Sequence, residues 1–185
     1  MSESVAWGVL GAGAIAKAFV HGVSDLSNSR VVAVGSRSAE KAQAFAEETG
    51  VTDATCHGSY EALLADDAVD AVYIATPHPM HARWASKAAE AGKHILCEKP
   101  AGVNRAEAMA MIEAARVNHV FFMEAFKDRC HPQTHKLLEL LKEKAVGEVR
   151  MVRVAFGFGG GERIDNPEGR LFNLELACGV IMDVG

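Results

Sequence analysis

The chain has 185 residues, of which 49% are hydrophobic and 23% charged, and 19 Lys and Arg stand against 24 Asp and Glu for a net charge of −5. This composition is typical of a soluble globular protein with one domain or slightly more, and it excludes a disordered chain. The mild acidity predicts no nucleic-acid or membrane partner, and no apolar stretch approaches the ~18 residues of a membrane span.

The first 125 residues alternate short apolar runs with longer stretches of helical spacing. The predicted strands are Val5–Leu10, Val31–Val34, Ala71–Ala75, His94–Cys97 and Val120–Phe122. The predicted helices are Ile15–Leu26, a stretch opened by Ser38 and ended by Gly50, His81–Ala91, and a stretch from Asn104 to about Asn118. Ser38 and Asn104 are residue types that cap helix N-termini. The alternation predicts parallel βαβ units and an α/β fold with a doubly wound Rossmann sheet.

The pattern changes after Ala125, which divides the chain into predicted domains of residues 1–125 and 126–185. The second domain is expected to begin with a helix at about residues 133–144, followed by a long strand, Glu148–Phe158, whose side chains alternate between two faces. Such a strand suits an open, mainly antiparallel sheet. Because one strand does not complete a sheet, we expect a truncated α+β substrate domain.

A glycine motif follows the first predicted strand and opens the first helix. Gly11, Gly13 and Ala16 form the pattern G-x-G-x-x-A. Gly11 permits a tight turn, Gly13 lets the backbone approach a pyrophosphate, and Ala16 allows close packing of helix on strand. The free N–H groups of the helix start, at Ala14 and Ile15, attract phosphates. The motif predicts a dinucleotide site; a glycine turn without a ligand and a Rossmann-like methyltransferase are the alternatives.

The second predicted strand ends in Ser36-Arg37-Ser38, where an NAD site usually has an acidic residue that binds the ribose 2′-hydroxyl. An arginine instead suits a 2′-phosphate, the two serine hydroxyls add hydrogen bonds, and Lys41 adds positive charge one helical turn later. We therefore expect NADP rather than NAD as the cofactor. The alternatives are that Arg37 is a surface arginine, or that it stacks on adenine without selecting the phosphate.

The predicted strand at residues 94–97 runs into Cys97-Glu98-Lys99-Pro100. Open α/β sheets bind their ligands at the carboxyl ends of parallel strands, which is where this segment is expected. Lys99 brings an ammonium group next to the Glu98 carboxylate, and Pro100 restricts the backbone. Glu-Lys pairs are common on protein surfaces, so the motif gains meaning only in combination with the others.

Five segments together resemble the Gfo/Idh/MocA oxidoreductases, the family of glucose–fructose oxidoreductase and inositol dehydrogenase. The segments are GAGAIA, SRS, ATPHPMHARWASKAAEAGKHILCEKP, MEAFKDRCHPQTHKLLELLKEKAVGEVRMVRVAFGF and RLFNLELACGVIMDVG, in the family's order along essentially the whole chain. The MEAF-x-x-RCHPQ and RLFN elements are most similar to the branch of dihydrodiol dehydrogenase and NADP-dependent D-xylose dehydrogenase.

The resemblance implies roles for several residues of the first domain. Lys99 corresponds to the lysine that contacts the reacting hydroxyl or carbonyl, where its charge stabilises alkoxide character. Glu98 is then expected beside the cofactor ribose. In the family, a loop after the corresponding strand lines the cofactor, and its counterpart here is Thr76, Pro77 and His78. His81 belongs to the family's P-x-x-H element and is expected among the cofactor-binding residues, although a single histidine at this position is more typical of an ordered helix start than of a catalyst.

In the second domain, the resemblance places Arg129 near the substrate pocket, with a surface or interdomain salt bridge as the equal alternative. Asp183 matches the aspartate of the family's D-x-G-x-[HY] element and is expected to orient the substrate or the acid–base residue. That element finishes with His or Tyr two residues after Gly185, so we expect the general acid/base to be missing from this sequence. Two departures from the family pattern are Cys178-Gly179-Val180 before the aspartate and the loop Gly159–Gly161.

His131 and His135 lie four residues apart, but the sequence offers no third ligand, so we expect no metal. The four cysteines are far apart and form no C-x-x-C pair: they are Cys56, Cys97, Cys130 and Cys178. Because the first residues also lack the positive charge of a secretory signal, we expect reduced thiols in a cytoplasmic protein.

The predicted function is NADP-dependent hydride transfer between nicotinamide and a carbinol carbon of a sugar, polyol or cyclic diol, with Lys99 and Asp183 as the catalytic candidates. The resemblance also implies a homo-oligomer that pairs through the C-terminal sheet, for which the strand at residues 148–158 is the candidate surface. The alternative is a non-catalytic dinucleotide-binding module, or a truncated product that lacks the general acid/base.

Overall fold

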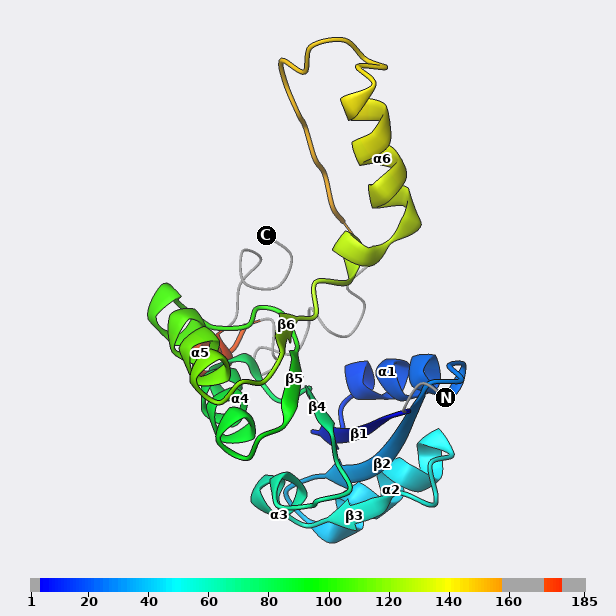
Figure 1. Cartoon of the computed structure of the whole chain (residues 1–185), viewed down its shortest axis with the longest axis vertical. Coiled ribbons are helices and arrows are strands. Elements are labelled where there is room, and N and C mark those ends of the chain that lie inside the picture. The colour runs from blue at the N-terminus through cyan, green and yellow to red at the C-terminus, as the bar shows by residue number, and fades with distance from the viewer. Residues whose placement is uncertain (1–3, 158–171, 178–185) are drawn as a thin grey trace. The chain divides into compact units, whose positions relative to one another are not determined.

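The computed structural model describes residues 4–157 and 172–177, and the chain divides into two compact units, Met1–Glu124 and Ala125–Gly185 (Figure 1). The predicted boundary lies one residue later than this division. None of the helices in the described residues has both the length and the hydropathy that a bilayer crossing requires.

The described residues of the first unit form one sheet of six parallel strands in the order β3-β2-β1-β4-β5-β6. The strands are β1 (Val5–Leu10), β2 (Ser29–Gly35), β3 (Thr55–His57), β4 (Ala71–Ile74), β5 (His94–Cys97) and β6 (Phe122–Glu124). All residues of β4 are buried, as expected for a central strand covered on both faces. The strand order reverses between β1 and β4, which makes this the switch point where α/β sheets bind ligands. The predicted doubly wound parallel sheet is confirmed.

Helices cover both faces of this sheet. They are α1 (Ala14–Ser24), α2 (Ala39–Thr49), α3 (Tyr60–Leu64), α4 (His81–Glu90) and α5 (Arg105–Val117). Consecutive residues of β4 face opposite sides of the sheet. Tyr73 stacks on Phe19 of α1, with ring centroids 4.0 Å apart. Ile74 belongs to a core that also contains Trp84 of α4 and Met111 of α5. Residues of β4 that point toward α1 are therefore separated by the sheet from those that pack on α4 and α5.

Side-chain caps explain where three of these helices begin. Ser38, Ser59 and Asn104 each accept a hydrogen bond from the N–H three residues later. The predicted caps at Ser38 and Asn104 are confirmed. Two elements were not predicted, because β3 has only three residues and α3 only five, too short for a periodic signal. The last strand, β6, begins two residues after the predicted start at Val120.

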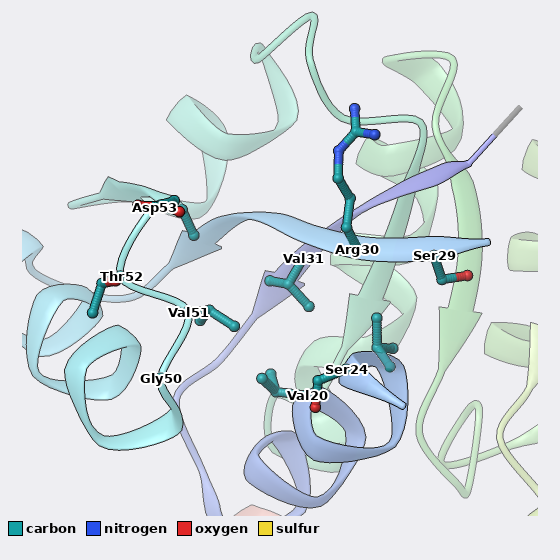
Figure 2. Close-up of a pocket in the computed structure, with 11 residues that line it drawn as sticks. Val20, Ser24, Ser29, Arg30, Val31, Gly50, Val51, Thr52 and Asp53 are labelled. Carbon is teal, nitrogen blue, oxygen red and sulfur yellow. The ribbon is translucent and has the colours of Figure 1, made fainter. Parts of the chain in front are cut away.

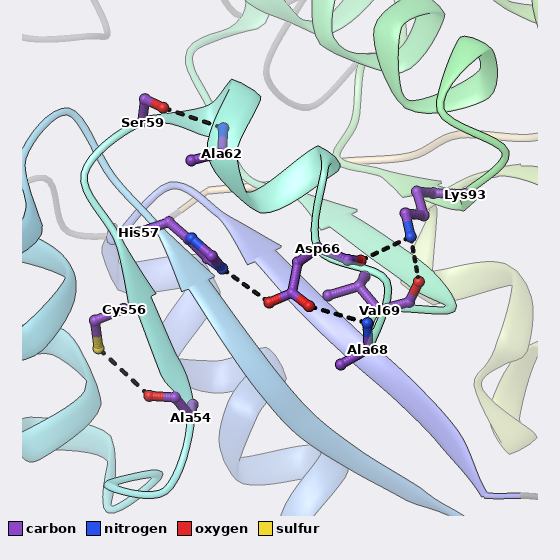
Figure 3. A network of polar contacts seen from close by, with 9 residues as sticks. All are labelled: Ala54, Cys56, His57, Ser59, Ala62, Asp66, Ala68, Val69 and Lys93. Atoms are coloured by element: carbon purple, nitrogen blue, oxygen red, sulfur yellow. Dashed lines mark hydrogen bonds and ion pairs between the residues drawn. The ribbon is translucent and has the colours of Figure 1, made fainter.

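A polar network fixes the connection from β3 through α3 to β4 (Figure 3). The Asp66 carboxylate lies 2.9 Å from His57 Nε2 and accepts a 2.9 Å hydrogen bond from the Ala68 N–H. Buried Lys93 donates to the carbonyl oxygens of Asp66 and Val69, at 2.8 Å each. The Ala68 N–H, and then the bond with His57, lower the pKa of Asp66. The network holds the chain where it enters β4.

The described residues of the second unit contain one α-helix, α6 (Pro132–Lys142), and two 3₁₀ turns at Lys127–Cys130 and Leu174–Leu176. The helix predicted at about residues 133–144 is thus confirmed with a slightly earlier start and end. His131 precedes it, and its Nδ1 accepts a 3.1 Å hydrogen bond from the Gln133 N–H. This histidine is a helix cap.

The long strand predicted at Glu148–Phe158 is wrong over residues 148–157, which form no strand. Val152 and Val154 on one alternating face expose 74% and 86% of their surface, and Val149 and Met151 on the other expose 52% and 69%, so neither face is buried. A strand needs the N–H and C=O groups of a neighbour, and none of the described residues pairs with this segment. The described residues therefore contain no open antiparallel sheet through which the predicted oligomer would pair. Phe158 and Gly159–Gly161 lie outside them.

Candidate functional site

Four of the segments singled out in the sequence lie at one edge of the sheet. The glycine turn follows β1, Ser36–Ser38 follows β2, Thr76–His78 follows β4, and Glu98 and Lys99 follow β5. Because these strands are parallel, their carboxyl ends meet at the same edge, which we call the carboxyl edge. The topology thus brings together residues that are far apart in the sequence.

The turn between β1 and α1 is closed around Gly11 and open around Gly13. Gly11 has a φ of +103°, and a Cβ there would lie 2.8 Å from the carbonyl oxygen of Ala75, in the loop after β4. Around Gly13, which is exposed, no atom lies within 4 Å of the position of an added Cβ. The turn is therefore seated against β4 at its first glycine and accessible to a ligand at its second.

The start of α1 has no side-chain cap, because its N-cap residue is Gly13. Among the other described α-helices, α4 also lacks a side-chain cap, whereas α2, α3, α5 and α6 have one. Ala14 and Ile15, the first residues of α1, are exposed. A helix start leaves N–H groups without partners and carries a partial positive charge. The carboxyl edge therefore has a position suited to an anion at the start of α1.

The segment after β2 presents positive charge next to the start of α2. Ser36 is buried and its N–H donates to the last carbonyl of β3 at 3.1 Å, whereas Arg37 and Lys41 are exposed. The Ser38 hydroxyl accepts a 3.4 Å hydrogen bond from the Lys41 N–H, so its oxygen caps α2, and the same hydroxyl, after a backbone hydrogen bond, helps to lower the pKa of Glu40 in the first turn of that helix. Burial raises the pKa of Tyr60, and the charge of Arg37 acts in the opposite direction. Arg37 and Tyr60 are thus electrostatic neighbours.

The loop after β4 is mostly enclosed. Thr76 and His78 are buried, and Pro77 between them is exposed. Among the residues that the structure describes, the buried Thr76 hydroxyl has no hydrogen-bond partner. A buried polar group without a partner costs about 1–3 kcal/mol, so this oxygen marks a place where a ligand would recover a bond.

The segment after β5 is held from β4. The Tyr73 hydroxyl donates to Glu98 Oε1 at 2.6 Å, and the other carboxylate oxygen accepts a 3.2 Å hydrogen bond from the Lys99 N–H. Burial, followed by the hydrogen bond and the charge of Glu98, raises the pKa of Tyr73 above its ordinary value. Tyr73 therefore stays protonated and acts as a donor that fixes the carboxylate beside Lys99.

Two more side chains hold the backbone directly after Lys99. The His81 ring is fully buried, with Nδ1 2.8 Å from the Pro100 carbonyl oxygen and Nε2 2.9 Å from the Thr76 carbonyl oxygen. Glu124, at the end of β6, accepts a 2.9 Å hydrogen bond from the Ala101 N–H. Neither Glu124 nor Tyr73 was identified from the sequence. Their hydrogen-bond partners lie at the ends of neighbouring strands, and only the order of the strands brings them together.

Several residues predicted for the site belong to the second unit, which is described by itself. Arg129 is exposed in the 3₁₀ turn before α6. Asp183 and Cys178-Gly179-Val180 lie outside the described residues. Within the described ranges, no group of three or more His, Cys, Asp or Glu is arranged to hold a metal ion. His131 caps α6, and His135 is exposed.

A shallow hollow of about 360 Å³ opens at the opposite edge of the sheet (Figure 2). It is lined by the end of α1, the start of β2 and the loop between α2 and β3, with Arg30 and Asp53 as its charged residues. None of the residues predicted for the functional site lines this hollow. The chemistry-bearing groups are therefore at the carboxyl edge, away from this hollow.

Comparisons with known proteins agree with this geometry. Residues 5–126 match the family model GFO_IDH_MocA, described as "Oxidoreductase family, NAD-binding Rossmann fold". The chain is 38% identical over 181 residues to a trans-1,2-dihydrobenzene-1,2-diol dehydrogenase of Xenopus tropicalis, covering 97% of this chain and 53% of that protein. It is also 38% identical over 179 residues to a D-xylose 1-dehydrogenase (NADP(+)) 2 of Haloferax volcanii, with 97% and 53% covered.

The structure is similar to a 3-ketoreductase from Actinomadura kijaniata crystallised with NADP. The TM-score is 0.74 at 34% identity, and the match covers 80% of this chain and 47% of the other. The chain thus spans about half the length of the curated relatives it matches. The branch suggested by the MEAF-x-x-RCHPQ and RLFN elements is the one to which these relatives belong.

Proposed function

The chain belongs to the Gfo/Idh/MocA oxidoreductase family, and from this membership we propose that it is an NADP-dependent oxidoreductase acting on a carbinol carbon of a sugar, polyol or cyclic diol. The observation that carries the proposal is the uncapped start of α1 at Gly13, which lies at the same edge of the sheet as Lys99. The diol and xylose dehydrogenases among the relatives, and the neighbour that holds NADP, support the substrate class and the cofactor.

The residues at the carboxyl edge fit a dinucleotide with a 2′-phosphate. Gly13 leaves space for a diphosphate against the first N–H groups of α1. The Arg37 guanidinium and the start of α2 supply positive charge for the 2′-phosphate. The Thr76 hydroxyl, buried without a partner, supplies a polar contact in the loop after β4. When bound, such a cofactor supplies or accepts a hydride at its nicotinamide ring.

This chain's own contribution to the reaction is charge stabilisation and alignment. The Lys99 ammonium is proposed to contact the substrate oxygen and to stabilise negative charge on it as the carbinol carbon is oxidised. Glu98, fixed by the Tyr73 hydroxyl, holds the backbone at Lys99 through its N–H. The ties at Pro100 and Ala101 prevent this segment from moving away from β4 and β6. Alignment of this kind lowers the barrier without any further chemistry from the protein.

The cofactor assignment is tested by titrating NADPH and NADH into the wild type and Arg37→Ala. A charge-assisted hydrogen bond contributes about 1.5–3 kcal/mol, so we expect NADPH to bind at least about tenfold more weakly and NADH to bind almost unchanged. Arg30→Ala is the matched control, because this exposed arginine lies at the opposite edge of the sheet. Equal losses for the two cofactors would remove the argument for the 2′-phosphate.

The activity is tested by NADPH-linked turnover with a panel of sugars, polyols and cyclic diols. Lys99→Ala is expected to lower kcat by about a hundredfold while the NADPH affinity stays unchanged, since the ammonium acts on developing charge. A wild-type chain that binds NADPH but neither oxidises a carbinol with NADP nor reduces the corresponding carbonyl with NADPH would instead favour a dinucleotide-binding module.

A further inference from the structure

We propose that His81 is a positioning residue that ties the loop after β4 to the loop after β5 and thereby sets the place of Lys99 relative to the cofactor. The inference depends on the proposed function for its consequence in catalysis, but the tie itself is a property of the folded chain. It differs from the expectation that His81 contacts the cofactor, because the ring has no exposed surface and both nitrogens face backbone carbonyl oxygens.

The two carbonyl groups belong to different loops of the carboxyl edge. Nε2 lies 2.9 Å from the oxygen of Thr76, directly after β4, and Nδ1 lies 2.8 Å from the oxygen of Pro100, directly after Lys99. A carbonyl oxygen can only accept, so each bond needs a hydrogen on the ring nitrogen. Each nitrogen therefore faces a different loop, so the two contacts can be removed one at a time.

The tie extends a series of contacts that begins at the glycine turn. The Ala75 carbonyl oxygen lies so close to Gly11 that a Cβ there would meet it at 2.8 Å, so the loop after β4 is seated against the turn. His81 links the next carbonyl in that loop to Pro100, and Glu124 holds the following residue, Ala101. Turn, loop and lysine segment are thereby kept in a fixed relation to one another.

The position of His81 explains how one ring reaches both loops. It is the first residue of α4, which begins just after the loop that follows β4 and runs antiparallel to the strands. The preceding 3₁₀ turn, His78–Met80, brings the ring of His78 to 5.6 Å from that of His81. Neighbouring strands β4 and β5 end side by side, so a ring between them faces both chain ends.

The experiment is amide hydrogen exchange of the chain without cofactor, followed by mass spectrometry in peptides that cover residues 75–78 and 98–101. His81→Ala is expected to speed exchange about tenfold in both segments, because each loop, once released from the ring, opens more often and exposes the N–H groups of Ala75 and Ala101, which are hydrogen-bonded in the wild type. In His81→Asn the amide nitrogen takes the place of Nδ1, so exchange should rise only at residues 75–78. In His81→Gln it takes the place of Nε2, so exchange should rise only at residues 98–101.

His57→Asn is the control, because this half-buried histidine belongs to the separate network with Asp66 and should leave both segments unchanged. Wild-type exchange in folded His81→Ala, or the same change in both segments for the Asn and Gln variants, would overturn the proposal. If His81→Ala does not fold, the Asn and Gln pair alone decides.

A second readout uses turnover and follows the same logic. His81→Gln should keep the NADPH affinity and lose kcat by about tenfold, whereas His81→Asn should lose NADPH affinity and keep kcat. A merely structural role would lower stability in both variants without this split. Because exchange is measured without a ligand, a chain that binds no NADPH would refute the proposed function and leave the exchange result to judge the tie by itself.

Discussion

Gly11 and Gly13 have different physical reasons to be glycine, although the motif treats them alike. At Gly11 the backbone has a positive φ of +103° and a side chain would collide with the backbone of Ala75. At Gly13 the backbone is extended, with φ −96° and ψ 175°, and the space around it is open. Nothing in the fold therefore requires glycine at position 13, which leaves the approach of a ligand as the reason for it.

Alanine substitutions are expected to separate these two roles. Gly11→Ala should lower the free energy of unfolding by about 1–3 kcal/mol, because the residue is strained and its Cβ meets a backbone oxygen. Gly13→Ala should leave the free energy of unfolding within about 0.5 kcal/mol of wild type and weaken NADPH binding about tenfold or more. Urea unfolding and NADPH titration of the two variants provide the measurement. Unchanged NADPH affinity in Gly13→Ala would mean that no phosphate lies there.

The residues of the carboxyl edge were predictable where a motif contains them and not where strand order creates them. Gly11, Arg37 and Lys99 were identified because turn, charge and neighbouring residues are contiguous in sequence. The pairs Tyr73–Glu98 and Glu124–Ala101 join strand ends 25 and 23 residues apart, and only the adjacency of β4, β5 and β6 brings them into contact. The sequence predicted two roles for Ser38, a helix cap and a contact with a 2′-phosphate, and the structure confirms the cap.

At the scale of elements, periodicity and caps predicted the long helices and buried strands of the first unit, and failed in two ways. The short β3 and α3 carry too few residues to show a period. The segment at 148–157 shows strict alternation but forms no strand, because alternation describes two faces and says nothing about a partner strand. Polar contacts around Asp66 hold β3, α3 and the entry to β4 in the folded chain, and such contacts leave no periodic pattern in the sequence.

This network predicts a pH-dependent contribution to stability. Hydrogen bonds from Ala68 N–H and His57 lower the pKa of Asp66, so the folded state binds a proton there less readily than the unfolded chain. The stabilisation is therefore present above the ordinary carboxyl pKa and is lost as the pH falls through the lowered value. We expect Asp66→Asn to cost about 1–3 kcal/mol near neutral pH and less in acid.

The measurement for Asp66 is urea unfolding between about pH 7 and pH 3, the range in which carboxylates of lowered pKa lose their contribution. The wild type should lose stability more steeply than Asp66→Asn as the pH falls, so that the two curves converge. Glu48→Gln serves as the comparison, because this carboxylate is exposed and pairs with Lys17 on the surface. Parallel curves for wild type and Asp66→Asn would show that the carboxylate contributes nothing specific.

At the scale of the whole molecule, the described core belongs entirely to the first unit. Every described hydrophobic residue that is buried has a number of 115 or lower, and α6 has no buried residue. The part that matches the family model, residues 5–126, is almost the same as this unit. The proposed dinucleotide residues, from Gly11 to Lys99, also lie within it. The described core and the proposed cofactor site thus belong to the same compact unit.

We therefore expect a chain of residues 1–126 to fold and to bind NADPH like the full chain. It retains all six described strands and the hydrogen bond from the Ala101 N–H to Glu124, so its unfolding in urea should be cooperative. Both tryptophans, Trp7 and Trp84, belong to the first unit, so their fluorescence reports this unit alone in either chain. The urea midpoint should be unchanged and the NADPH dissociation constant should agree within about twofold. A short chain that unfolds without a transition, or that binds NADPH far more weakly, would show that residues after 126 take part in forming the site.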